Sequence, residues 1–261
     1  MYLLLDIGGT NIKLATSSDG RTISEPMIVP TPTDFEKGMQ VIEQTVPQLV
    51  GGGRMQAIGA GVAGVLNPEH STLIKAPHLP NWINKPLKRR LEAVFGISLK
   101  LDNDVALGGL GEANFGQYKD EKIIAYIAIG TGVGGVRIVD SQIDRNSQGF
   151  EPGHQIIVPD GNVCNCGGKG HLEAYVSGAY LKDPVNWDEV AKYLALGLHN
   201  TIVHWSPDLV LLGGSVTESL PKDRIVANLT SLLTIFPAVP KIDKATLGNR
   251  AGLLGALKLL S

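Results

Sequence analysis

A chain of 261 residues can bury a sizeable core as one large domain or as two domains of ordinary size. Its apolar content of 43% and charged content of 18% are typical of a folded globular protein. The formal net charge of −2 offers no basic surplus for nucleic acid or an anionic membrane, and no run approaches the ~20 apolar residues of a membrane span. Residues 1–6 carry no basic leader, so a cytoplasmic protein is expected.

The first half of the chain predicts short strands that alternate with helices. Strands are expected at residues 2–5 and 12–17, on either side of a Gly8-Gly9 turn, and a third at residues 22–29. Asp34 is a typical N-cap for a helix that ends near Leu49, before three glycines. The pattern then predicts a strand at 55–61, a loop at 63–86, a helix at 86–95, a strand at 97–101 and a helix at 104–115.

The second half begins again with a strand at 122–129, a glycine turn at 130–135 and a strand at 136–139, which indicates a weak internal duplication. A helix at 188–204, a strand at 209–212 and a helix at 251–260 follow. Strands interleaved with helices predict an α/β fold with a mixed sheet in each half. We expect one domain over residues 1–117, with helix 250–261 packing back on it, and a second over residues 118–249.

The opening motif, Asp6-Ile7-Gly8-Gly9-Thr10-Asn11-Ile12-Lys13, indicates a phosphate-binding turn. Paired glycines let backbone N–H groups approach a phosphate, and Asp6 at a strand end can hold Mg²⁺ or its waters. A Gly-Gly pair alone is more often a plain hairpin turn, and the spacing is not that of a Walker A loop.

Two further glycine turns favour the nucleotide interpretation. One is Gly130-Thr131-Gly132-Val133-Gly134-Gly135, and the other is Gly213-Gly214 after the strand at 209–212. Three glycine turns that each adjoin an apolar strand predict a nucleotide cleft.

Asn103-Asp104 follows a predicted strand and opens a predicted helix. A carboxylate there can accept the proton of a sugar hydroxyl that attacks a γ-phosphoryl group. Asp is also a favoured N-cap residue, so Asp104 as a base and Asp104 as a cap both stay open, and Asn103 either holds sugar hydroxyls or satisfies the loop.

The two cysteines, Cys164 and Cys166, lie between His154 and His171. Two thiolates and two imidazoles make a tetrahedral set suited to structural Zn²⁺, here as a loop clamp rather than a zinc finger. The remaining histidines, His70, His78, His199 and His204, are expected to lack partners.

Together these motifs resemble the ROK family of bacterial sugar kinases and related repressors, over nearly the whole chain. The resemblance rests on Asp-x-Gly-Gly-Thr, the central Asn-Asp, Gly-Thr-Gly-x-Gly-Gly, Glu-x-Gly-His, Cys-x-Cys-Gly-x-x-Gly, Leu172-Glu173-Ala174-Tyr175 and Pro207-Asp208-Leu209-Val210-Leu211-Leu212-Gly213-Gly214. It implies a two-domain actin-like (hexokinase/RNase H-like) ATPase fold, and homodimers are common among members.

The resemblance also implies roles for single residues. Asp104 is expected to be the catalytic base, and the sugar is expected to contact Gly64, Asn103, Asp104, Glu151, His154 and Glu173. ATP and Mg²⁺ are expected at Asp6, Gly8, Gly9, Thr10, Asn11, Lys13, Gly130, Thr131, Gly132, Gly134, Gly213 and Gly214. The expected zinc ligands are His154, Cys164, Cys166 and His171.

The chain departs from the family pattern at three points. His171 stands where the family usually has a third cysteine, Phe150 adds bulk before Glu151, and the stretch between Glu173 and Pro207 is shorter than in typical members. A repressor is not expected, because the first strand begins at Tyr2 and leaves no room for a DNA-binding helix-turn-helix.

The sequence therefore predicts a kinase that transfers the γ-phosphoryl group of ATP to a hexose hydroxyl, with glucose as the first choice of sugar. N-acetylglucosamine, N-acetylmannosamine and fructose are the alternative acceptors. A non-catalytic sugar sensor is the competing class of protein, and an ATPase that acts on another acceptor is a third.

Overall fold

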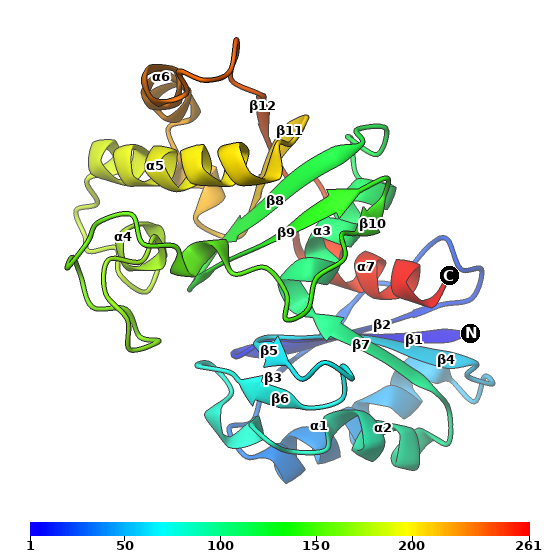
Figure 1. Ribbon diagram of the computed structural model, residues 1–261. Coiled ribbons are helices and arrows are strands. Elements are labelled where there is room, and N and C mark those ends of the chain that lie inside the picture. The colour runs from blue at the N-terminus through cyan, green and yellow to red at the C-terminus, as the bar shows by residue number, and fades with distance from the viewer. The chain divides into compact units, whose positions relative to one another are not determined.

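The computed structural model describes all 261 residues, which fall into two compact units. Unit 1 contains Met1–Gln117, Arg145–Gly149 and Asn249–Ser261, and unit 2 contains Tyr118–Asp144 and Phe150–Gly248 (Figure 1). The predicted domains, residues 1–117 with helix 250–261 and residues 118–249, stay a prediction. None of the helices combines the length and the apolar character that a membrane span requires.

Unit 1 is built on a five-stranded mixed sheet in the order β3-β2-β1-β4-β7. Its strands are β1 (Tyr2–Ile7), β2 (Asn11–Ser17), β3 (Met27–Pro30), β4 (Ala57–Val62) and β7 (Leu99–Asn103). The hairpin strands β1, β2 and β3 pair antiparallel, whereas β4 runs parallel to β1 and β7 parallel to β4. β5 (Val65–Leu66) and β6 (Leu73–Lys75) form a small separate hairpin.

The third strand is shorter than predicted, because β3 begins at Met27 rather than at residue 22. The carboxylate of Asp19 accepts hydrogen bonds from the backbone N–H groups of Arg21 and Thr22, both at 2.8 Å. These bonds hold the chain in a turn, and Pro26 lacks the N–H that a strand ladder needs.

The predicted helix signals of unit 1 are confirmed. Asp34 caps α1 (Phe35–Val50) by accepting a hydrogen bond from the backbone of Lys37, and Gly51 ends this helix in the left-handed conformation. α2 (Leu87–Phe95) likewise ends at a left-handed glycine, Gly96, after the short 3₁₀ helix η1 (Pro80–Trp82).

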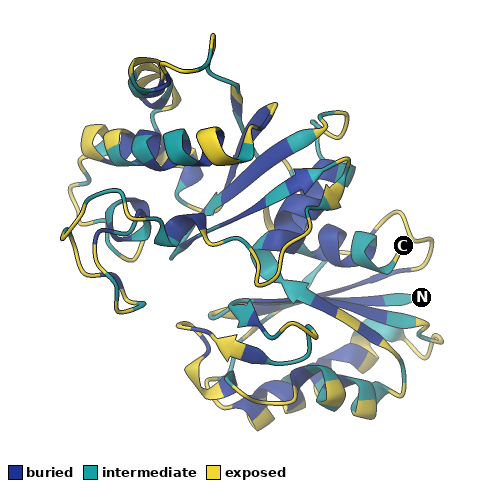
Figure 2. Cartoon of the chain, viewed as in Figure 1, coloured by how far each residue is buried: buried dark blue, intermediate teal, exposed yellow.

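The core of unit 1 lies between the sheet and the helices α1 and α2, while α3 (Asp104–Phe115) and α7 (Ala251–Leu260) cover the other face (Figures 1 and 2). Alternate residues of β1 point into this core and meet residues of α1 at helical spacing. These residues are Leu3, Leu5, Ile7, Phe35, Met39, Ile42 and Val46.

The helices α3 and α7 touch through their backbones. A Cβ atom added at Gly255 would lie 1.8 Å from the carbonyl oxygen of Leu107, and one added at Gly111 would lie 2.1 Å from that of Ala251. Since neither site has room for a methyl group, the glycines set the distance between the helices.

Unit 2 is built on a second five-stranded mixed sheet in the order β10-β9-β8-β11-β12. Its strands are β8 (Ile123–Ile129), β9 (Val133–Val139), β10 (Gln142–Ile143), β11 (Leu209–Gly213) and β12 (Lys241–Lys244). Its helices are α4 (Glu173–Val176), α5 (Trp187–Trp205) and α6 (Lys222–Leu232), and the short 3₁₀ helices are η2 (Pro152–His154) and η3 (Thr217–Ser219). α5 and α6 pack against the core of this unit (Figure 1).

The two sheets repeat one topology. In each, an antiparallel meander of three strands is followed by two strands that run parallel to the first. The duplication suggested by the hairpins at residues 2–17 and 122–139 therefore extends over both complete sheets. The second glycine turn is shorter than predicted, because β9 begins at Val133, so that Gly134 and Gly135 pair with Ala128 and Ile127 inside the sheet.

We predict that Gly255→Ala lowers the free energy of unfolding by about 1–3 kcal/mol, because the new methyl group has to displace the backbone of α3. Chemical denaturation measures the change in the free energy of unfolding. Lys258→Ala, at a partly exposed site on the same helix, is the control and should change it by less than ~0.5 kcal/mol. Equal effects of the two substitutions would contradict this account of the α3–α7 contact.

Candidate functional site

The first glycine turn of unit 1 exposes two backbone amides. Gly8 donates its N–H to the carbonyl of Asn11 at 3.0 Å, which closes the turn between β1 and β2. The N–H groups of Gly9 and Thr10 have no partner in the chain. Two adjacent unpaired amides in a tight turn make a small anion-binding surface.

Asp6 and Lys13 stand opposite each other next to this turn. They are register partners on β1 and β2, and Lys13 Nζ lies 3.0 Å from Asp6 Oδ2. Their side chains are only 13% and 23% exposed, respectively, so the ion pair is partly shielded from water. The pair places one cation and one carboxylate at the end of the hairpin.

The N-cap of α3 is Asn103, and the alternative that Asp104 serves as the cap is wrong. Asn103 Oδ1 accepts a hydrogen bond from the backbone N–H of Ala106 at 3.0 Å, and its amide nitrogen donates to the carbonyl of Gly64. The carboxylate of Asp104 instead accepts a hydrogen bond from the next amide, that of Val105, at 2.9 Å. Because Asn103 performs the capping, the side chain of Asp104 is not needed for it.

The structure brings Asp104 close to Asp6. Gly61 of β4 is the register partner of Asp6, and a Cβ atom at Gly61 would lie 3.2 Å from the Cα of Asp104. Burial, and then the negative charge of Asp6, raise the pKa of Asp104 to about 7, against a smaller lowering by hydrogen bonds to backbone amides and by Lys13. A carboxylate with that pKa suits proton transfer at neutral pH.

The second glycine turn, in unit 2, has the same kind of exposed amides as the first. Gly130 donates its N–H to the carbonyl of Gly132 at 2.9 Å, whereas the N–H groups of Thr131 and Gly132 are unpaired. The third turn lies beside it, because Val216 donates to the carbonyl of Ile129 at 3.0 Å. Gly213 ends β11 directly before this contact, with Gly214 next in the chain.

The four predicted metal ligands are brought together. The ligand atoms of His154, Cys164, Cys166 and His171 all lie within 4.8 Å of one another. Within this set, Cys166 Sγ lies 3.1 Å from His171 Nδ1. Cys164 is buried, and its N–H donates to the carbonyl of Gly168 at 2.8 Å, which folds the loop back on itself.

The predicted sugar-binding side chains of unit 2 surround this loop. His154 has its Nδ1 3.8 Å from the sulfur of Cys164 and its Nε2 3.9 Å from a carboxylate oxygen of Glu151. Glu173 Oε1 lies 3.5 Å from Cys164 Sγ, and Glu173 Oε2 accepts a hydrogen bond from the backbone N–H of Val133 at 2.9 Å. One ring nitrogen of His154 therefore faces the Cys164 sulfur and the other faces the Glu151 carboxylate.

Two histidines that were expected to lack partners have them. His70 Nδ1 lies 3.1 Å from the carbonyl of Leu101 and 3.6 Å from a carboxylate oxygen of Asp102, and His199 Nδ1 lies 3.2 Å from the side-chain oxygen of Asn200. His78 is exposed, and its Cβ is packed so closely on Gly9 that a side chain at Gly9 would collide with it. No sequence signal links His78 to Gly9, because the contact depends on the fold of the loop at 63–86.

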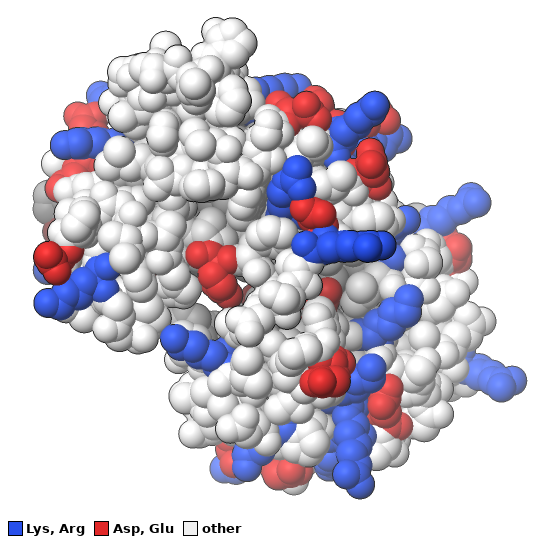
Figure 3. Space-filling view, viewed as in Figure 1, with Lys and Arg blue, Asp and Glu red and all other residues white.

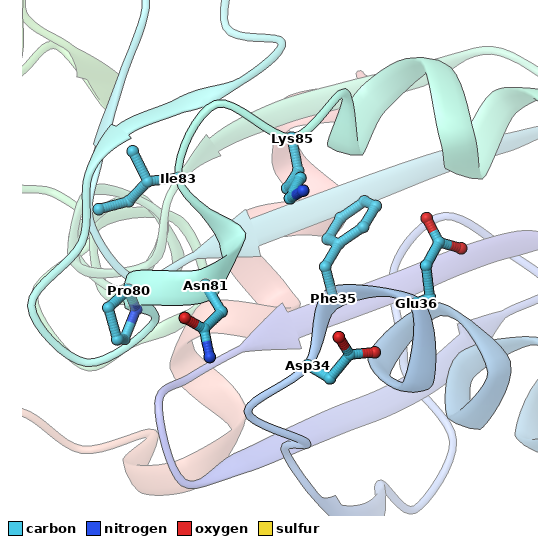
Figure 4. A pocket seen from close by; sticks show the side chains of 7 residues that line it. All are labelled: Asp34, Phe35, Glu36, Pro80, Asn81, Ile83 and Lys85. Atoms are coloured by element: carbon cyan, nitrogen blue, oxygen red, sulfur yellow. The ribbon is translucent and has the colours of Figure 1, made fainter.

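A cavity of about 370 Å³ in unit 1 lies outside the predicted site. Figure 4 shows its lining at the start of α1 and around η1, namely Asp34, Phe35, Glu36, Pro80, Asn81, Ile83 and Lys85. None of the residues proposed to bind sugar or nucleotide is among them. On the molecular face of Figure 3, basic and acidic side chains are interspersed rather than gathered by sign.

The chain is similar to known sugar kinases over its whole length. Glucokinase of Streptomyces coelicolor is 29% identical, with 98% of this chain and 96% of the relative covered, and N-acetyl-D-glucosamine kinase of Vibrio atlanticus is 29% identical, with 98% of each covered. The crystal structure of a ROK family glucokinase from Streptomyces griseus, in complex with glucose and AMPPNP, superposes with a TM-score of 0.87 at 27% identity, covering 99% of this chain and 98% of that one.

These similarities confirm the predicted fold class, a mixed α/β fold of the actin-like ATPase type. The model of the ROK family matches residues 2–186 and 182–261, so the two matched stretches meet within the segment that the sequence marks as short. The chain therefore belongs to the ROK family.

Proposed function

We propose that this protein is an ATP-dependent kinase that phosphorylates a hexose hydroxyl, with Asp104 as the general base. The observation that carries the proposal is the position of Asp104, which is released from capping by Asn103 and has a pKa of about 7 beside Asp6 and Lys13. At neutral pH about half of such carboxylates are ionised and able to take the proton of an attacking hydroxyl. The curated relatives, which act on glucose and N-acetylglucosamine by name, support the same reaction.

The glycine turns are proposed to bind the phosphates of ATP. Each unit offers two consecutive unpaired amides, at Gly9 and Thr10 in unit 1 and at Thr131 and Gly132 in unit 2. Asp6 would hold Mg²⁺, which supplies positive charge to a bound triphosphate. Lys13 adds a cation from the chain itself, and its ion pair with Asp6 keeps both groups at the end of the hairpin.

The proposed sugar contacts are hydrogen-bonding groups on each unit. Unit 1 contributes Asn103 and Gly64, which are already joined by a hydrogen bond that fixes the amide of Asn103. Unit 2 contributes Glu151, His154 and Glu173 around the Cys164 loop. Glucose is the proposed acceptor, in line with the relatives, and a cytoplasmic location is proposed because ATP is the donor.

The cluster in unit 2 is proposed to hold structural Zn²⁺. Two sulfur and two imidazole donors whose ligand atoms lie within 4.8 Å of one another suit this ion, and His171 supplies the imidazole where the family usually has cysteine. When bound, the metal supplies a cross-link between the two ends of the loop. His154 would then be held through Nδ1, which fixes the direction of its Nε2 toward Glu151.

We predict that sugar-dependent ADP release occurs with glucose and falls at least about 100-fold in Asp104→Asn, because the variant cannot accept the hydroxyl proton. A panel of glucose, N-acetylglucosamine, N-acetylmannosamine and fructose, with coupled ADP detection, identifies the acceptor. Asp223→Asn, at an exposed carboxylate of α6, is the control and should retain full turnover. Heat stabilisation by a sugar without any ADP release would favour a sensor instead.

We predict that kcat/KM for the sugar falls on the acid side of about pH 7, because Asp104 must be ionised to act as a base. Lys13 lowers the pKa of Asp104, so Lys13→Met should move this acid limb to higher pH, whereas Lys13→Arg should leave it in place. Rate measurements from pH 5 to pH 9 at saturating ATP test the shift. An acid limb that stays in place in Lys13→Met would show that Lys13 does not act on the base.

We predict that the purified protein contains about one zinc ion per chain, and that His171→Ala loses it and lowers the Tm by roughly 5 °C or more. His171→Cys should retain the metal, because thiolate is an equally competent ligand. Elemental analysis and thermal denaturation measure both effects, with His204→Ala, at an exposed site on α5, as the control. A protein that takes up no zinc even on titration would overturn the assignment.

A further inference from the structure

The second glycine turn is held at both of its ends by one short segment of unit 2, residues 173–179. At the start of the turn, Gly178 donates its N–H to the carbonyl of Gly130 at 2.8 Å, and Ala179 donates to that of Thr131 at 3.2 Å. At the end, Glu173 accepts the N–H of Val133 at 2.9 Å. Between these anchors only the two amides of Thr131 and Gly132 are left unpaired.

The Val133 contact joins this turn to the segments that carry the proposed sugar ligands. Its N–H is bound by Glu173, and its carbonyl lies so close to Gly153 that an added Cβ there would be 2.0 Å away. Gly153 directly precedes His154, and Glu173 lies 3.5 Å from the sulfur of Cys164. The backbone of Val133 thus contacts both the segment that contains Gly153 and His154 and the segment that contains Glu173.

The first glycine turn lacks such an anchor from a distant carboxylate. Its N–H at Gly8 is bound within the hairpin itself, by the carbonyl of Asn11. Thr31 also anchors the first turn, because it donates its backbone N–H to the carbonyl of Thr10 at 2.9 Å and its hydroxyl to the carbonyl of Gly8 at 2.7 Å. Only the second turn is held by a side-chain carboxylate, which accepts the buried backbone N–H of Val133.

We propose that Glu173 is a positioning residue for the nucleotide, in addition to the sugar contact assigned to it under the proposed function. Its Oε2 fixes the Val133 amide and thereby orients the free amides of Thr131 and Gly132 toward a phosphate. Its Oε1 lies beside Cys164. One carboxylate therefore links the second glycine turn to the loop around which the proposed sugar contacts of unit 2 lie. The proposal rests on the phosphate-binding role of the turn.

Two substitutions separate this role from a sugar contact. Glu173→Gln keeps a side-chain oxygen that can accept the N–H of Val133, whereas Glu173→Ala removes it. We expect the Kd for Mg·AMPPNP, measured by calorimetry without sugar, to rise about tenfold in Glu173→Ala, as for the loss of one hydrogen bond to a charged group. In Glu173→Gln it should stay within about twofold of the wild-type value, while sugar binding weakens in both variants.

The outcomes are distinguishable from failure of the proposed function. If the wild type binds no nucleotide, the proposed function fails; if it binds and Glu173→Ala binds equally well, only the positioning role fails. Zinc content and Tm of both variants exclude a general loss of structure. Should Glu173→Ala not fold, amide hydrogen exchange of the wild type decides: the N–H of Val133 should be protected relative to those of Thr131 and Gly132, and equal exchange would overturn the proposal.

Discussion

Close approach of backbone to backbone is the constraint on which the proposed chemistry depends. Asp104 packs against Gly61, the strand residue beside Asp6, where an added Cβ would lie 3.2 Å from the Cα of Asp104. α3 holds that position because Gly111 and Gly255 let α7 lie against it. The raised pKa of Asp104 follows from this packing, since burial and the neighbouring carboxylate both disfavour its ionised form. In this unit, the helix packing and the acid–base chemistry are parts of one arrangement.

The elements with strong local signals could be predicted from the sequence. α1 lies between its predicted cap at Asp34 and its terminating Gly51, because capping and a left-handed glycine are decided within a few residues. α3 spans the predicted residues 104–115, with Gly116 after it in an extended conformation. β12 was not predicted, since Lys241–Lys244 is charged at both ends, and α6 begins without a side-chain cap. Those two elements are stabilised by tertiary packing rather than by local preference.

In the candidate site too, local motifs could be predicted from the sequence, whereas contacts between distant residues could not. Motif residues could be named in advance, because the glycine turns, the Cys-x-Cys pair and Asn103-Asp104 are compact in sequence. The role of each atom could not be predicted. Asn103 and Asp104 both have side chains that can cap a helix, and the structure shows that Asn103 is the cap, because its side-chain oxygen accepts the N–H of Ala106. The bond from Val133 to Glu173 joins residues 40 positions apart, and the contact of His78 with Gly9 crosses an irregular loop, so neither leaves a local pattern.

The membership of α7 in unit 1 has a consequence for synthesis on the ribosome. The helix follows all of unit 2 in the chain, yet it covers one face of the first sheet with the buried side chains of Leu253 and Leu257. At ~5–20 residues per second, that face waits on the order of ten seconds for its cover while unit 2 is translated. During that interval the sheet face that α7 covers is exposed in the nascent first unit. A chaperone that binds exposed hydrophobic segments could bind there.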